Sequence, residues 1–226
     1  MNLERVLCTG FYVPPASARV AKAYGIDHWD DIARISFMFE VSLSDGREVK
    51  RFWSWDTQNN LATMAGAGQT PVTFTPYQPE GEAETEADQA FINDTYWLLF
   101  PFQLVWSNPE VSVETEDVTM PLGGEPAASR VTAAFPSEGG YTPGDTYELY
   151  FADQGDDAGD GLIDQWRYIS GRSDNSLATT WEDHVRLGPI VISTTHRNAD
   201  GSFELRLTDL SATLTDGATV TPQPIE

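Results

Sequence analysis

The chain has 226 residues, of which 40% are hydrophobic and 12% aromatic, and its formal net charge at pH 7 is −22. The many aromatic side chains exclude a disordered chain, and the shortage of Lys and Arg argues against a nucleic-acid partner, since phosphate binding requires clustered positive charge. No apolar stretch is long enough for a transmembrane helix, and a single cysteine, Cys8, excludes an internal disulfide and a metal site built from several cysteines.

The first segment of the chain predicts short helical turns. Residues 1–15 contain no recognisable signal peptide and are expected to form a flexible leader. Ser17 is expected to cap a helix over residues 18–24 that ends at Gly25, and a second turn follows over 28–33.

A β-hairpin follows. Residues 35–41 and 49–55 alternate between apolar and polar side chains, as half-buried strands do, and an Asp-Gly turn lies between them. This alternation places Arg51, Trp53 and Trp55 on one face of the second strand.

Two short strands, 61–64 and 71–77, precede a helix expected over residues 86–100 and ended by Pro101. Residues 96–102 are apolar on nearly every side. Such a segment must be buried all round or must cover another apolar surface.

The rest of the chain is β in character, with turn signals between strands expected at 111–120, 129–135, 146–152, 162–170, 179–187, 189–196 and 202–214. We expect one domain over 16–216 and a flexible tail over 217–226. The pattern predicts a mainly β fold of about 10–11 antiparallel strands, in a barrel or a strongly curved sheet, with helices packed on one side.

Several segments together resemble an uncharacterised bacterial family of secreted or envelope proteins, related to the LolA and LppX group of outer-membrane lipoprotein carriers. They are AYGID (23–27), ISFMF (35–39), RFWSWD (51–56), FINDTYWLLFPF (91–102), WRY (166–168) and TWEDH (180–184). The resemblance covers about residues 21–214. It implies an unclosed antiparallel β-barrel with a helical lid, a cavity for acyl chains, and a periplasmic or secreted location, but no reaction.

A half-barrel with an aromatic inner face needs a lid, and the helix around residues 91–102 is the element apolar enough to supply it. If lid and sheet do not pack fully, the gap is a cavity for an apolar ligand. The ligand-binding candidates are Phe37, Phe39, Trp53, Trp55, Trp97, Phe100, Trp166 and Arg51. Arg51 is expected to pair with a surface acid, although it could also hold an acidic head group or stack on a tryptophan.

Catalytic and metal-binding patterns are weak. Asp183 and His184 are neighbours on one strand and should point to opposite faces, and no serine-hydrolase, dinucleotide or phosphate-loop motif occurs. The acidic stretch 153–164 begins like a calcium loop, but Arg167 stands where the twelfth-position Glu is required, so a solvated hairpin tip is favoured. We therefore expect neither an enzyme nor a cofactor.

Two interpretations remain open. The first is a carrier of an apolar ligand, a lipid or a lipoprotein acyl chain, which an envelope partner protein could meet at the lid. The alternative is a structural or interaction module of the bacterial envelope with a fully packed core.

Overall fold

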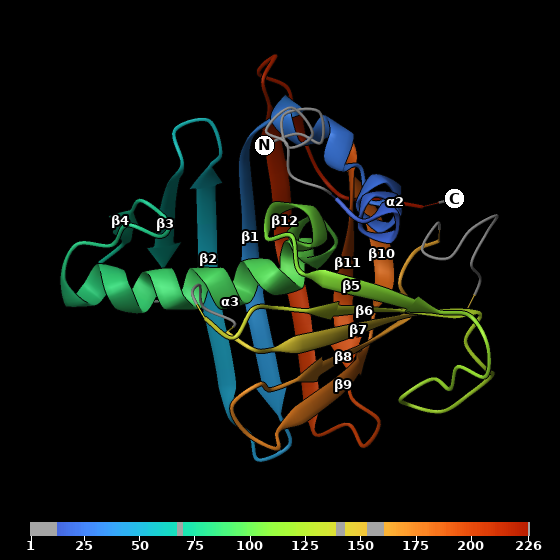
Figure 1. The fold of residues 1–226 in the computed structure, drawn as a ribbon. Helices are drawn as coiled ribbons and strands as arrows, with labels where there is room; N and C mark the ends of the chain where they lie inside the picture. Colours follow the sequence, from blue (N-terminus) through green and yellow to red (C-terminus); the bar gives the residue numbers. More distant parts are fainter. Residues whose placement is uncertain (1–12, 67–69, 139–142, 153–160, 226) are drawn as a thin grey trace.

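Two antiparallel sheets and two α-helices make up the described part of the chain (Figure 1). The structure, a computed structural model, describes residues 13–66, 70–138, 143–152 and 161–225. A nine-stranded sheet has the order β14-β10-β11-β12-β1-β2-β3-β4, with β13 beside β12, and a five-stranded sheet has the order β5-β6-β7-β8-β9. The long helix α3 and the smaller sheet both cover one face of the larger sheet (Figure 1).

The element bounds are α2 (Pro15–Ala23), the 3-10 helix η1 (Ile26–Asp31), β1 (Ile32–Leu43), β2 (Glu48–Asp56), β3 (Leu61–Ala65), β4 (Val72–Phe74), α3 (Gly81–Trp106), β5 (Glu110–Glu114), β6 (Ser129–Ala134), β7 (Thr146–Phe151), β8 (Gln165–Ile169), β9 (Ser176–Thr180), β10 (Glu182–Leu187), β11 (Ile190–Arg197), β12 (Phe203–Leu214), β13 (Thr219–Val220) and β14 (Gln223–Pro224). The mainly β, antiparallel and unclosed class with helices is confirmed. The strands divide between two sheets, whereas the sequence predicted about 10–11 strands in one.

The predicted hairpin forms the middle of the larger sheet. β1 and β2 pair so that Phe37 lies opposite Trp53 and Phe39 opposite Arg51. Because side chains alternate along a strand, these residues share the inner face, which α3 covers. β1 also pairs with β12, and there Phe39 lies opposite Leu207.

The helix α3 is longer than the sequence predicted, since it begins at Gly81 and passes through Pro101 to Trp106. Proline removes one helical hydrogen bond and normally ends or kinks a helix. Here the helix kinks: Leu99 has non-helical angles (φ −131°, ψ 28°). Beyond the kink, Phe102 and Trp106 pack against Trp29 of η1, so burial of this last segment favours continuation of the helix.

The N-terminal helix begins earlier than expected. Pro15 occupies its first turn, where a missing N–H is tolerated, so Ser17 lies inside the helix and makes no capping hydrogen bond. Gly25 ends it with φ of 89°, as predicted.

The single strand expected over 179–187 is two strands in different sheets. β9 pairs with β8 in the smaller sheet, and β10 pairs with β11 in the larger one. The chain changes sheets at Trp181, whose N–H donates to the Asp164 carbonyl, and Asp183 adopts a positive φ of 55°. At the C-terminus, where no regular structure was expected, β13 and β14 pair with β12 and β10.

One continuous hydrophobic cluster joins α2, α3 and the inner faces of both sheets. No helix in the described residues is long and apolar enough to cross a membrane.

Candidate ligand-binding cavity

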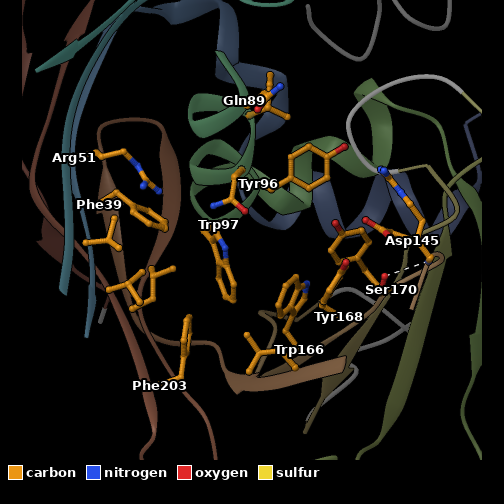
Figure 2. Close-up of a pocket in the computed structure, with 18 residues that line it drawn as sticks. Phe39, Arg51, Gln89, Tyr96, Trp97, Asp145, Trp166, Tyr168, Ser170 and Phe203 are labelled. Carbon is orange, nitrogen blue, oxygen red and sulfur yellow. Dashed lines mark hydrogen bonds between the residues drawn. The ribbon is translucent and has the colours of Figure 1, made fainter. Parts of the chain in front are cut away.

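A cavity of about 810 Å³ lies between α3, the inner face of the larger sheet and the inner face of the smaller sheet (Figure 2). Its lining residues are Phe39, Val41, Val49, Arg51, Gln89, Ile92, Asn93, Tyr96, Trp97, Asp145, Tyr147, Trp166, Tyr168, Ser170, Arg172, Leu177, Phe203 and Leu205.

The larger sheet supplies an apolar wall. Val41 and Phe39 on β1, Val49 on β2, and Phe203 and Leu205 on β12 all line the cavity. These side chains share a face because they lie two residues apart on strands that pair in register, Val41 opposite both Val49 and Leu205.

The helix α3 and the smaller sheet supply aromatic rings. Trp97 of α3 and Trp166 of β8 both line the cavity, and their ring centroids are 4.5 Å apart. Figure 2 shows Trp97 and Trp166 between Phe203 and Tyr168. The helix α3 and the smaller sheet therefore touch each other at the wall of the cavity.

The sequence-based candidates fall into two groups. Phe39, Arg51, Trp97 and Trp166 line the cavity. The other four candidates, Phe37, Trp53, Trp55 and Phe100, lie outside the lining.

The residues outside the lining pack in the core. Trp53 and Trp55 both contact Phe91 of α3, with ring centroids 5.2 and 5.4 Å away, so the first half of α3 closes directly on this part of the sheet. Phe100 packs behind the cavity wall, 4.7 Å from the ring of Tyr147. Strand alternation predicts which face of the sheet these residues occupy. It does not predict along how much of that face the helix α3 stays in contact with the sheet.

Arg51 is held by a buried carboxylate. Its Nε donates to Asp94 Oδ2 at 2.7 Å and its Nη2 to Asp94 Oδ1 at 2.6 Å. Asp94 belongs to α3 and is fully buried, whereas the sequence had indicated a surface acid. The guanidinium lies over the ring of Phe39 at 4.8 Å and not over a tryptophan. Burial raises the pKa of Asp94, and the Arg51 guanidinium opposes this rise.

The opposite side of the cavity is polar. Asp145, just before β7, lies there with Tyr147, Tyr168 and Ser170, and Arg172 follows on the loop after β8. In Figure 2 Asp145, Tyr168 and Ser170 lie across the cavity from Arg51. Asp145 stands in a Pro-Gly-Asp turn and gave no signal of its own, because many acids of this chain occupy turns.

The histidines lie outside the cavity lining. His184 Nε2 lies 2.9 Å from the Tyr24 hydroxyl, which also accepts the Ile163 N–H at 3.0 Å, so this cluster ties the end of α2 to β10. Burial lowers the pKa of His184. His196 is fully buried against Trp181, with ring centroids 4.2 Å apart, and burial lowers its pKa to about 3. Both rings are therefore neutral at pH 7.

Within the described parts of the chain, no group of three or more His, Cys, Asp or Glu could hold a metal ion. Most of the acidic stretch 153–164, residues 153–160, lies outside the described residues. Asp164 at its end accepts the Ala152 N–H.

No protein-family model matches the sequence, and no curated protein matches it. Solved structures are similar in fold. A DUF1329 family protein from Desulfovibrio piger is 8% identical, with 88% of this chain and 92% of that chain covered and a TM-score of 0.42. A LolA superfamily protein from Nitrosomonas europaea is 8% identical, with 88% and 93% covered and a TM-score of 0.44. A LolA superfamily protein is among the structures to which this chain is similar.

Proposed function

We propose that this protein binds a lipid-like ligand in the cavity and carries it without changing it chemically. The observation that carries this proposal is the cavity of about 810 Å³ between α3 and the two sheets. Sites for small organic ligands span roughly 300–1,000 Å³ and combine an apolar wall with a few polar groups.

The composition of the wall supports a hydrocarbon chain as part of the ligand. Valine, leucine and phenylalanine side chains from β1, β2 and β12 line one side, and Ile92 and Trp97 of α3 adjoin them. Burying a methylene group against such a surface is worth about 0.8 kcal/mol. The cavity favours the carrier over the alternative of an envelope module with a fully packed core.

A binding role fits the lining better than catalysis does. The described lining contains Ser170 and Asp145 but pairs neither of them with a histidine base. The resemblance inferred from the sequence leads us to include lipoprotein acyl chains among the ligands. It also leads us to propose a periplasmic or secreted location and a partner protein in the envelope.

Native mass spectrometry of the purified protein, followed by solvent extraction and lipid analysis, tests the proposal. We expect a fatty-acyl or similar amphiphile at near one per chain, or stoichiometric uptake by delipidated protein of a fluorescent long-chain amphiphile from a set with anionic, neutral and zwitterionic head groups.

A matched pair of variants on β2 locates the site. Val49 lines the cavity, whereas its neighbour Lys50 is exposed. Val49→Trp should fill part of the cavity and weaken probe binding, and Lys50→Trp should leave it unchanged. A protein that takes up no probe, or equal binding by both variants, would contradict the proposal.

A further inference from the structure

Asp145 is a buried carboxylate with no counter-charge of its own. It is 7% exposed and lines the cavity. One oxygen, Oδ1, accepts the Gly171 N–H at 2.9 Å, and no Lys, Arg or His of the described residues forms an ion pair with it. An ionised carboxylate removed from water is costly unless it is paired. The missing partner would have to come from the ligand.

Aromatic rings line the same cavity as this carboxylate. Tyr147 is 5% exposed, its ring lies 6.0 Å from that of Tyr96 and 5.5 Å from that of Tyr168, and all three rings line the cavity. Burial raises the pKa of Tyr147, and the negative charge of Asp145 adds to this effect. Aromatic faces attract alkylammonium groups, which they bind best in a water-poor enclosure.

An arginine, Arg172, lies close in sequence to the residue that holds this carboxylate, and it forms no ion pair with Asp145. Arg172 directly follows Gly171, the residue that donates to Asp145, and its own N–H donates to Ser170 Oγ at 3.2 Å. Arg172 is exposed, lines the cavity and forms no ion pair with any residue in the described ranges. One cavity that holds an unpaired carboxylate and an unpaired arginine suits a ligand group carrying both signs.

The second arginine of the cavity is not available in the same way. Two of the guanidinium nitrogens of Arg51 are bound to Asp94. A free fatty-acid carboxylate could pair with Arg172, but Arg51 is already satisfied and Asp145 would repel a second negative charge in the cavity, which disfavours binding.

We propose that the ligand is an amphiphile with a zwitterionic head group, whose alkylammonium lies against Asp145 within the rings of Tyr96, Tyr147 and Tyr168, and whose phosphate is held by Arg172. This inference rests on the proposed function, since the hydrocarbon chain must occupy the apolar wall. It goes further in assigning the head-group chemistry and its residues.

Binding of dodecyl amphiphiles to delipidated protein, measured by calorimetry below their critical micelle concentrations, tests this assignment. The probes share one chain and differ in the head group: dodecylphosphocholine, dodecyltrimethylammonium, dodecyl maltoside and dodecanoate. We expect dodecylphosphocholine to bind at least about tenfold more tightly than dodecanoate.

Three variants test the contributions of Asp145 and Arg172 separately. Asp145→Asn keeps an acceptor for the Gly171 N–H and should weaken dodecylphosphocholine and dodecyltrimethylammonium by about tenfold, without weakening dodecanoate. Arg172→Gln should weaken dodecylphosphocholine but not dodecyltrimethylammonium. Asp174→Asn removes an exposed acid of the same loop, outside the lining, and should change neither.

Equal affinity of native protein for dodecylphosphocholine and dodecanoate would overturn the head-group assignment and leave the carrier proposal standing. The assignment would also be overturned if a folded Asp145→Asn variant kept the same preference for dodecylphosphocholine over dodecanoate. Failure of all four probes to bind would instead remove the proposed function itself. The comparison of head groups on native protein needs no variant, so it tests the head-group assignment even if Asp145→Asn does not fold.

Discussion

Asp94→Asn is expected to destabilise the fold by about 3 kcal/mol, because it breaks the buried network between α3 and β2. Asp94 Oδ2 accepts the Arg51 Nε and the Trp53 Nε1, each at 2.7 Å. Asp94 Oδ1 accepts the Arg51 Nη2 at 2.6 Å and the Asn93 Nδ2 at 3.0 Å. An asparagine has one acceptor oxygen, so its amide nitrogen would face donors and leave them without a partner.

The magnitude follows from burial. Removing one partner of a buried ion pair costs about 3–5 kcal/mol, and the 25% exposure of the Arg51 side chain puts this pair at the lower end. Urea unfolding followed by circular dichroism measures the change. Arg34→Met is the control on the same hairpin, since the exposed Arg34–Asp56 pair should contribute less than about 1 kcal/mol. A loss below about 1 kcal/mol for Asp94→Asn would refute the view that this network holds α3 to the sheet.

Three further predictions test other parts of the fold. The folded-state pKa of His196, about 3, lies below its unfolded value of about 6.5, so the stability supplied by its neutral ring is present above pH 6.5 and lost as the pH falls toward 3. His196→Phe should therefore flatten the fall of unfolding free energy between pH 6 and 4 by up to about 1.4 kcal/mol per pH unit; a parallel pH profile would contradict this. Gly25→Ala would place Cβ 2.5 Å from the Pro189 carbonyl oxygen at φ of +89°, so we expect a loss above about 2 kcal/mol. Gly46→Ala, in open space at φ of +83°, should lose about 1 kcal/mol in the same urea series, and equal losses would show that the close contact is relieved. Tyr24→Phe removes a buried hydroxyl with two hydrogen bonds and should lower the urea-unfolding free energy by about 1–3 kcal/mol, whereas an unchanged midpoint would mean that water replaces the hydroxyl.

Local patterns predicted the parts of the fold that depend on neighbouring residues. The alternation along β1 and β2 identified the hairpin and the face that carries Arg51 and Trp53, because strand geometry leaves only two faces to choose between. The length of α3 could not be predicted in the same way. Pro101 signals a helix end, and the burial that carries the helix past it depends on Trp29, more than seventy residues earlier in the chain.

In the candidate site, too, some residues could be predicted from local patterns and others could not. Phe39 and Trp97 could be identified from the sequence as inner-face aromatics, whereas Asp145 and Arg172 could not. Their position depends on the approach of Gly144, just before β7, to Gly171, just after β8, two glycines whose backbones touch. A contact of this kind has no short-range pattern, so the polar side of the cavity became visible only in three dimensions.

The pairing of β1 with β12 has a consequence for biosynthesis. Phe39 of β1 lies opposite Leu207 of β12 in the middle of the larger sheet. The ribosome therefore synthesises β1 long before its partner β12 is available. Until β12 emerges, one edge of β1 has no partner, and its aromatic side chains are incompletely covered. Pairings between distant segments form slowly. We therefore expect the growing chain to be open to aggregation or degradation for most of its synthesis, and a holding chaperone to have its greatest effect before residue 203 is added.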